Sequence, residues 1–338
     1  MLTVYEDLPS GMLHFEANEL HRILPGPSLI HLPGEKKEPL FLSILLHGNE
    51  TTGWDAVRAV LEQYREKPLP RALSLFIGNV RAARHSLRHL DDQPDYNRIW
   101  KAEGHSKEDV MVRQVLEEMR ERQVFACIDI HNNTGHNPHY ACVNRLATPF
   151  FQLARLFSPT VVYFIKPDSV LSMAFANICP AVTVECGRPV EQSGALHAQE
   201  FIETALHLDH LDEESMTVHD VDLFHTVAIV RVREDVTASI DDETAQLKFL
   251  PDIDLMNFRE IMAGTQLARV RHGVGMPLLA ENEFGKNVAD RYFEVRNGWL
   301  YNTAPVMPSM LTLDMDIVRQ DCLCYLMERL DLDKTLSA

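Results

Sequence analysis

The sequence lacks the features that would direct the chain to a membrane or to nucleic acid. None of its apolar runs approaches the roughly 20 residues that are needed to cross a bilayer. Residues 1–7 are acidic and lack a long apolar segment, so no signal peptide is visible. Lys and Arg total 32 against 49 Asp and Glu, and the net charge of −17 opposes binding to nucleic acid and to anionic membranes. We therefore expect a cytoplasmic protein that binds neither.

The cysteines lack the spacing of a disulfide framework or a zinc knuckle. The chain has six, and none of them form a Cys-x-x-Cys pair. Cys322 and Cys324 are too close to bridge easily and too isolated to bind zinc together. We expect unpaired thiols in a reducing compartment, at Cys127, Cys142, Cys179, Cys186, Cys322 and Cys324.

From residue 39 to about 205 the sequence contains a regular alternation of short apolar runs and amphipathic segments. Strands are predicted at 40–46, 72–77, 124–130, 161–165 and 181–184. Between them, helices are predicted at 52–66, 107–122, 149–156 and 195–207. This alternation is typical of an α/β domain with a mostly parallel sheet flanked by helices.

The remainder of the chain has a different pattern. At 338 residues the chain exceeds the usual size of one hydrophobic core, so a second domain is expected. Residues 207–215 are polar and acidic and are predicted to be a linker. Short strands punctuated by glycine are predicted at 216–310, and an amphipathic segment at 316–330 is predicted to be a helix. We therefore predict an α/β domain at 1–210 and a small β-rich domain with a terminal helix at 216–338.

Four polar residues lie at, or just beyond, the ends of four predicted strands: His47, Asn79, His131 and Glu185. Ligands bind at the carboxyl ends of the strands in such sheets, so these residues are expected to share a site. Glu50 follows His47 by three residues and can reach the same metal ion from one short turn. Two His and one Glu bind zinc and leave a coordination position open for hydrolysis. We predict one Zn²⁺ per chain, bound by His47, Glu50 and His131.

Each of these residues also has a simpler interpretation. A His-x-x-Glu pair occurs often by chance at a protein surface, and His131 could be a strand-end histidine with no ligand role. His136 and His139 follow in the same polar loop and are less favoured alternative ligands. Asp129 could orient the ring of a histidine ligand, as metal-bound histidines usually require. Cobalt or manganese could occupy the same ligands in place of zinc.

Glu185 ends a very apolar strand, where a carboxyl group needs a partner. An ion pair with Arg188 is one explanation. The other is a general base that takes a proton from water and hands it to the leaving nitrogen. Several arginines follow the second predicted strand and could be exposed loop residues without a functional role. Of these, Arg88 is the candidate for stabilising an oxyanion. Arg98, with Asn97, is the candidate for binding a substrate carboxylate, because a guanidinium group binds carboxylate bidentately.

Taken in order, these motifs resemble those of the succinylglutamate desuccinylase/aspartoacylase family, within the zinc carboxypeptidase superfamily. The matching segments are His47-Gly48-Asn49-Glu50, Asn79 through Arg88, Asp95-Tyr96-Asn97-Arg98, Asp129-Ile130-His131-Asn132 and Val184-Glu185-Cys186-Gly187. The resemblance covers residues from about 38 to 190 by motif. It implies a zinc carboxypeptidase-like catalytic domain, followed by a small β domain that narrows entry to the site.

The resemblance also implies an activity, the removal of an acyl group from an N-acyl amino acid. The implied roles are zinc binding by His47, Glu50 and His131, acid/base catalysis by Glu185, stabilisation of the carbonyl oxygen by Arg88, and binding of the substrate carboxylate by Asn97 and Arg98. Aspartoacylase-like members carry a Tyr and an Arg shortly before the general base, and the stretch 171–177 has neither. This departure favours a less acidic or bulkier N-acyl amino acid.

Two other functions are compatible with the same residues. A zinc carboxypeptidase acting on peptides would use the same zinc and Arg98, because it also cleaves an amide next to a carboxylate. A catalytically inactive metal- or ligand-binding protein would need a missing or misplaced general base, whereas Glu185 is present. With the N-acyl amino acid hydrolase as the leading interpretation, the expected partner is a small-molecule substrate. The sequence does not decide whether the protein forms a homo-oligomer.

Overall fold

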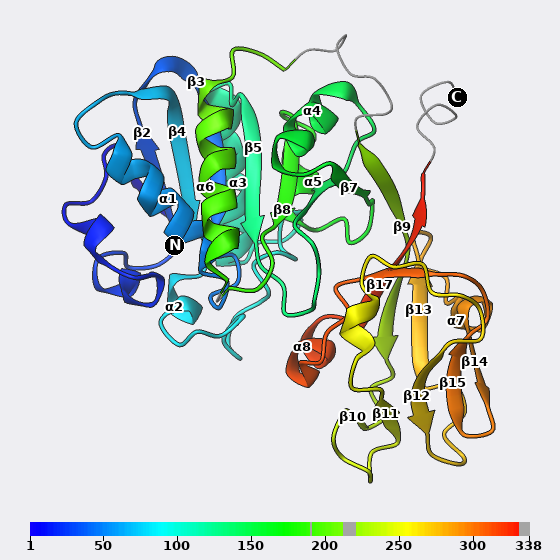
Figure 1. The fold of residues 1–338 in the computed structure, drawn as a ribbon. Coiled ribbons are helices and arrows are strands. Elements are labelled where there is room, and N and C mark those ends of the chain that lie inside the picture. Colours follow the sequence, from blue (N-terminus) through cyan, green and yellow to red (C-terminus); the bar gives the residue numbers. More distant parts are fainter. Residues whose placement is uncertain (190, 212–220, 331–338) are drawn as a thin grey trace. The chain divides into compact units, whose positions relative to one another are not determined.

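The chain forms two units, each with its own β-structure. The computed structural model describes residues 1–189, 191–211 and 221–330. The first unit comprises Met1–Asn132 and the described part of His139–Asp222. The second comprises the described residues from Leu223 onward together with the short segment Asn133–Pro138. Figure 1 labels most of the helices and strands of both units.

A mostly parallel sheet forms the centre of the first unit, in the order β1-β2-β4-β3-β5-β8-β6-β7. Its strands are β1 (Thr3–Tyr5), β2 (Ser28–Leu32), β3 (Gly34–Ile44), β4 (Leu69–Ile77), β5 (Ala126–His131), β6 (Tyr140–Val143), β7 (Thr160–Tyr163) and β8 (Ala181–Glu185). The strands β4, β3, β5 and β8 are parallel. β2 and β6 run antiparallel to β4 and β8. The predicted mostly parallel sheet is confirmed, and β6 is a strand that the sequence did not reveal.

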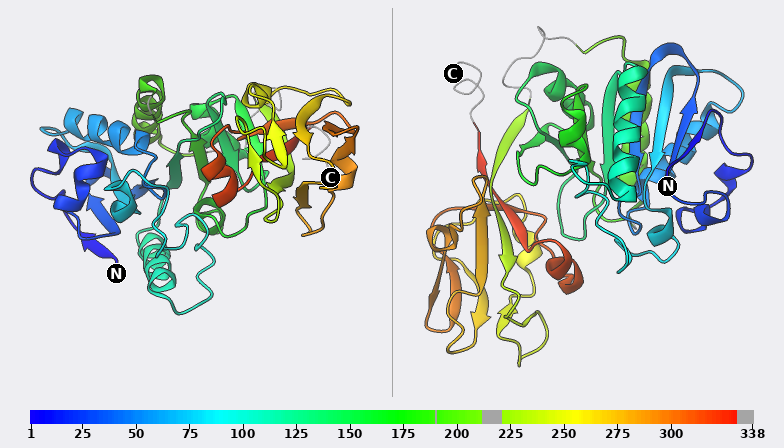
Figure 2. Two further views of the ribbon diagram at one scale, coloured as in Figure 1. Left: turned by 90° about the horizontal axis from the view of Figure 1, so that it is seen from below. Right: turned by 180° about the vertical axis from the view of Figure 1, so that it is seen from behind.

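Helices cover both faces of this sheet. α1 (Thr52–Gln63) and α6 (Gln192–His207) pack together on one face (Figure 1), and α3 (Lys107–Glu121) lies on the other (Figure 2). At the start of α3, Ser106 and Asp109 each accept a hydrogen bond from the other's backbone N–H, which satisfies two otherwise unpaired donors. The shorter helices are α2 (Val80–Ala83), α4 (Thr148–Phe157), α5 (Leu171–Phe175) and two 3₁₀ turns, Met12–His14 and Ala17–Arg22. Among the described residues, no helix is long and apolar enough to cross a membrane.

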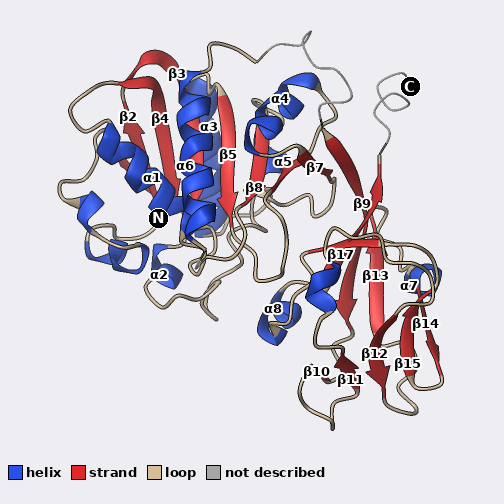
Figure 3. Cartoon of the chain, viewed as in Figure 1, coloured by secondary structure: helices blue, strands red, loops and turns tan. Residues whose placement is uncertain are grey.

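The second unit consists mainly of β-strands (Figure 3). β9 (Asp222–Val232) pairs antiparallel with β13 (Leu278–Asn282) and with β17 (Cys324–Arg329), and β17 pairs with β16 (Met307–Ser309). A separate five-stranded sheet contains, in order, β10 (Ala238–Ser239), β11 (Leu247–Phe249), β12 (Gln266–Val270), β15 (Trp299–Asn302) and β14 (Phe293–Arg296). The predicted small β-rich region is confirmed.

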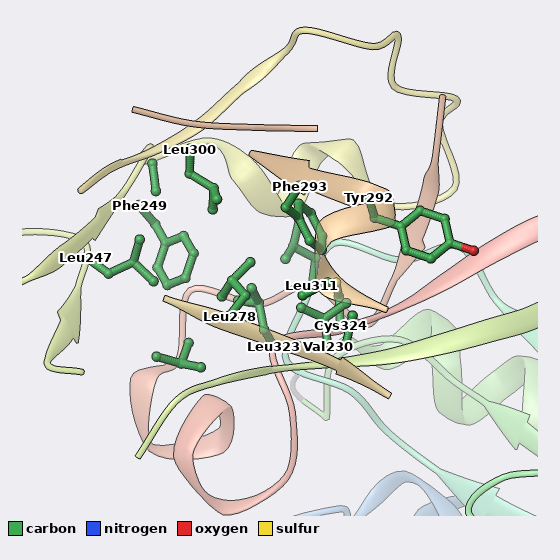
Figure 4. Packing of buried hydrophobic residues seen from close by; sticks show 14 of the residues in the cluster. Val230, Leu247, Phe249, Leu278, Tyr292, Phe293, Leu300, Leu311, Leu323 and Cys324 are labelled. Atoms are coloured by element: carbon green, nitrogen blue, oxygen red, sulfur yellow. The ribbon is translucent and has the colours of Figure 1, made fainter. Parts of the chain in front are cut away.

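Apolar side chains from these strands form the core of the second unit (Figure 4). Leu247, Leu278 and Leu300, from three different strands, are at most 1% exposed. Among its described residues, three short helical elements accompany the strands: Ile253–Met256, α7 (Ala289–Tyr292) and α8 (Met315–Gln320). The unit therefore has a hydrophobic core of its own.

The segment 316–330 does not form the single helix that its amphipathic pattern predicted. α8 ends at Gln320, where the next residue, Asp321, leaves the helical conformation at φ −127° and ψ −86°. Cys324–Arg329 is instead strand β17, which pairs with β9 on one side and β16 on the other. Pairing with distant strands here outweighs the local amphipathic pattern. Those partner strands are not visible in the sequence of the segment itself, so its pattern alone does not predict a strand. Of the predicted linker 207–215, residues 212–215 lie outside the described residues.

Candidate metal site

His47 and Glu50 lie in the turn that follows β3. Leu45, between the strand and His47, is fully buried at φ 53°, a left-handed conformation that is uncommon for leucine. Gly48 allows the turn to approach α2 closely, because a Cβ atom at this position would lie 2.2 Å from the backbone nitrogen of Ala83. Tight packing on both sides of His47 therefore fixes the course of the turn.

The three predicted metal ligands form one buried cluster. Nδ1 of His47 lies 2.7 Å from Oε1 of Glu50, and Nδ1 of His131 lies 2.8 Å from Oε2 of the same carboxylate. One ligand atom from each residue lies within 4.8 Å of the others, and no residue of the three is more than 7% exposed. In the part of the chain that the structure describes, this is the only such group of His, Cys, Asp and Glu side chains, and it includes neither His136 nor His139.

A second carboxylate faces the far nitrogen of each histidine. Nε2 of His131 lies 2.9 Å from Oδ2 of the fully buried Asp129, which is the contact anticipated from the sequence. Nε2 of His47 lies 3.2 Å from Oδ1 of Asp95, to which the sequence had assigned no role. Carboxylates in this position fix the ring orientation of metal-bound histidines and raise their basicity. Both histidines therefore present Nδ1 to Glu50 and Nε2 to an outer carboxylate.

Asn132, directly after His131, joins three elements at the site. Its backbone N–H donates to Oε2 of Glu50 at 3.1 Å. Its side-chain amide donates to Oγ1 of Thr52 and to the carbonyl of Gly187, both at 2.9 Å. These bonds connect the end of β5 to the start of α1 and to the segment after β8. In the sequence, Asn132 stood at the end of a family-like motif and in a polar loop, and this role was not predicted.

The charges of the cluster stabilise one another. Burial by itself raises the pKa of Glu50, but the neighbouring His47 and His131 lower that pKa far below its usual value. Burial lowers the pKa of His131, yet Asp129 and Glu50 outweigh it and raise that pKa well above its usual value. Glu50 is therefore an ionised carboxylate at neutral pH, as a metal ligand must be.

Comparison with known proteins identifies the family. Residues 38–211, slightly more than half of the chain, match the family model of the succinylglutamate desuccinylase/aspartoacylase catalytic domain. The chain belongs to this family. The family is hydrolytic, and the resemblance drawn from the five ordered motifs is confirmed. No curated protein matches the chain in sequence.

Solved structures of similar proteins share the fold. The succinylglutamate desuccinylase from Chromobacterium violaceum has a TM-score of 0.54 at 15% sequence identity, over 88% of this chain and 86% of that one. Murine aminoacylase 3 has a TM-score of 0.56 at 14% identity, over 88% of this chain and 96% of that one. A succinylglutamate desuccinylase/aspartoacylase from Rhodobacter sphaeroides has a TM-score of 0.52 at 13% identity, over 89% and 88%. At such low identities the similarity establishes the fold.

The donor set of this family member fits a zinc ion. Zinc binds imidazole nitrogens and carboxylate oxygens, and a set of two His and one Glu is typical of catalytic zinc. His47 and His131 each have an outer carboxylate partner that would hold the ring in a fixed orientation, as such ligands require. The three residues can therefore hold one divalent metal ion.

Glu185, the predicted general base of this family member, lies at the end of β8. It is in register with His131 on the adjacent strand β5. Paired residues of adjacent strands present their side chains on the same face of a sheet, so Glu185 lies beside His131. It is 6% exposed and is not one of the three clustered ligands. The strand register therefore places Glu185 opposite His131, outside the group of three ligands.

The other predicted residues come from the segment between α2 and α3. Arg88 donates to Oδ2 of Asp95 from Nη2 at 2.9 Å and from Nε at 3.3 Å. Nδ2 of Asn97 lies 3.3 Å from Nε2 of His131, and Arg98 donates from Nη1 to the carbonyl of Asn97 at 2.9 Å. Asn97 thus touches a predicted ligand directly, whereas Arg88 reaches the cluster through Asp95.

Two sequence features have local structural roles. Asn79, at the end of β4, caps α2, because its Oδ1 accepts a hydrogen bond from the backbone N–H of Ala82 at 3.1 Å. In the stretch 171–177, Phe175 is fully buried and stacks on Phe41 with ring centroids 4.3 Å apart. This aromatic side chain therefore belongs to the hydrophobic core.

Proposed function

We propose that this protein is a zinc-dependent amidohydrolase that removes the acyl group from an N-acyl amino acid. The observation that carries the proposal is the carboxylate of Glu50, held between Nδ1 of His47 at 2.7 Å and Nδ1 of His131 at 2.8 Å. Two His and one Glu are a ligand set of catalytic zinc with one position left open. Membership in a family named for desuccinylases and aspartoacylases supports the reaction class.

The residues around the cluster supply the acid/base chemistry. A zinc ion bound by His47, Glu50 and His131 would polarise the scissile carbonyl and lower the pKa of water to about 7. Glu185 would take a proton from the attacking water and later deliver it to the leaving amine nitrogen. Its position beside His131, outside the ligand set, supports this role.

Two arginines supply the remaining functions. Arg88 would steady the carbonyl oxygen as negative charge develops on it. Its side chain is 9% exposed and is held by two hydrogen bonds to Asp95, which supports a position that is set before the substrate binds. Arg98, next to Asn97, would bind the carboxylate of the amino acid, for which the planar guanidinium group is well suited.

Zinc content and hydrolysis, measured on the same preparations, test the proposal. We expect about one zinc per chain in the wild type, together with amino acid release from members of an N-acyl amino acid panel. His131→Ala should lose both. His139→Ala is the matched control, because His139 is half-buried against His197 and outside the cluster, and it should retain zinc.

The two readouts can fail separately. Zinc retained at one per chain in His131→Ala would refute the site. Zinc-loaded wild type that hydrolyses no N-acyl amino acid, but cleaves peptides with a free C-terminal carboxylate, would refute the deacylase proposal in favour of a carboxypeptidase.

A further inference from the structure

Asp95 contacts both a proposed metal ligand and the proposed oxyanion-stabilising arginine. Its Oδ1 lies 3.2 Å from Nε2 of His47, and its Oδ2 accepts two hydrogen bonds from Arg88. The backbone N–H of Asn97 also donates to Oδ1, at 2.7 Å, which fixes the carboxylate against its own loop. The side chains of Arg88 and Asp95 are 9% and 15% exposed, so these contacts lie largely out of water.

A backbone contact closes these residues into a ring. The N–H of Gly48 donates to the carbonyl of Arg88 at 3.1 Å. Since Gly48 follows His47 in the chain, contacts lead from His47 through Gly48 to Arg88, then through Asp95 back to His47. His47 cannot shift relative to Arg88 without breaking one of these contacts.

The carboxylate partner of the second histidine has a different environment. Asp129 contacts His131, which lies two residues further along the same strand, β5. Among the hydrogen bonds of the described residues, none joins Asp129 to an arginine. Each of the two outer carboxylates therefore contacts Nε2 of its histidine, but Asp95 also accepts hydrogen bonds from Arg88, whereas Asp129 does not.

We propose that Asp95 is a positioning residue that places the metal ligand His47 and the oxyanion group Arg88 relative to one another. This role rests on the proposed function. One oxygen of the carboxylate holds the imidazole ring and the other holds the guanidinium group, so loss of Asp95 affects both metal binding and turnover. Loss of Asp129 affects metal binding through His131 and leaves Arg88 in place.

Asp95→Asn removes the charge of this carboxylate with almost no change in the shape of the side chain. An asparagine at this position can keep its oxygen toward His47 and the N–H of Asn97, but its NH₂ group then faces the donors of Arg88. If the amide turns over, the NH₂ group faces the N–H of Asn97 instead. A neutral amide therefore cannot satisfy both sides, whereas the carboxylate accepts from all of them.

The experiment compares Asp95→Asn with Asp129→Asn and with a control in the same loop, Asp92→Asn. Asp92 is exposed and pairs with Arg81 at 3.0 Å, away from the ligands. Zinc affinity is measured by competition with a chelator, and kcat is measured at saturating zinc with an N-acyl amino acid. We expect zinc affinity to fall about 10–100-fold in Asp95→Asn and Asp129→Asn. At saturating zinc, kcat of Asp95→Asn should fall at least about tenfold below that of Asp129→Asn, and Asp92→Asn should match the wild type in both.

Wild-type zinc affinity in Asp95→Asn would overturn the proposal, and so would equal kcat values for Asp95→Asn and Asp129→Asn at saturating zinc. Zinc affinity is measurable without a substrate. An inactive wild type would therefore refute the proposed function, while the affinity comparison would still test whether Asp95 holds His47.

If Asp95→Asn does not fold, Arg88→Gln tests the same ring. Removal of a positive charge near the metal site should by itself strengthen zinc binding. A weaker affinity in Arg88→Gln would therefore report that Asp95, without its arginine, no longer holds His47. An unchanged or stronger affinity would overturn the proposal.

Discussion

Gly48→Ala should destabilise the protein strongly, although it adds only one methyl group. A Cβ atom at residue 48 would lie 2.2 Å from the nitrogen of Ala83, 2.3 Å from the carbonyl carbon of Ala82 and 2.7 Å from the carbonyl oxygen of Leu87. All three are backbone atoms, so no side-chain rotation can relieve the overlap. Gly48 does not have a positive φ, so the cost arises from these contacts and not from backbone conformation.

The size of the effect follows from the displacement required. Ordinary contacts of a Cβ atom begin near 3.4 Å, so the backbone around α2 must move by about 1 Å. Overpacking of a well-packed interior typically costs 1–3 kcal/mol. We place this substitution at the upper end, at about 3 kcal/mol of unfolding free energy, because backbone must move. The hydrogen bond from Gly48 to the carbonyl of Arg88 lies in the same region and would be strained as well.

Urea denaturation, followed by circular dichroism, measures this loss. Gly26→Ala is the matched control, because Gly26 is also buried, does not have a positive φ, and has no atom within 4 Å of the place that a Cβ atom would take. The control should change the unfolding free energy by no more than about 0.5 kcal/mol, or stabilise the protein slightly. An unfolding free energy for Gly48→Ala within about 0.5 kcal/mol of the wild type would refute the packing argument.

Three further predictions concern the site. Glu185→Gln should retain about one zinc per chain and lose at least about 100-fold in kcat; elemental analysis with steady-state kinetics checks both, and loss of zinc would contradict the assignment. Arg98→Ala should mainly raise KM, and an unchanged KM would refute its carboxylate-binding role. In protein freed of metal, the raised pKa of His131 means that this ring holds a proton at neutral pH, which zinc must displace. Zinc affinity should therefore rise with pH, by about tenfold per unit for each proton released; a pH-independent affinity in calorimetric titrations would contradict this.

The part of the site that the sequence revealed lies at, or just beyond, the ends of strands. His47, His131 and Glu185 each follow a short apolar run, and such runs are readable because burial on both faces of a parallel sheet demands them. Parallel strands then bring their carboxyl ends to one edge. Glu50 was readable because three residues of separation in a turn keep two side chains together.

The remainder depended on contacts that no local pattern encodes. Asp95 lies 48 residues from His47, in a segment without strand or helical periodicity, and their contact depends on how that loop folds back. The antiparallel strand β6 has only four residues, too few for a periodic signal. At the C-terminus, the segment 316–330 had an amphipathic pattern, and only its distant partners β9 and β16 decide that its second half is a strand.

The site therefore has two halves with different physical origins. On one side, the register of β5 places His131 two residues after Asp129 and opposite Glu185. A shift of that register by one residue would turn all these side chains to the other face, so the sheet core itself protects their geometry. On the other side, His47 is placed by loops, through Gly48 packed against α2 and through Asp95. No sheet register restores that half once a loop contact is lost, so substitutions at Gly48 and Asp95 should disturb the site at least as strongly as loss of the outer carboxylate in the sheet.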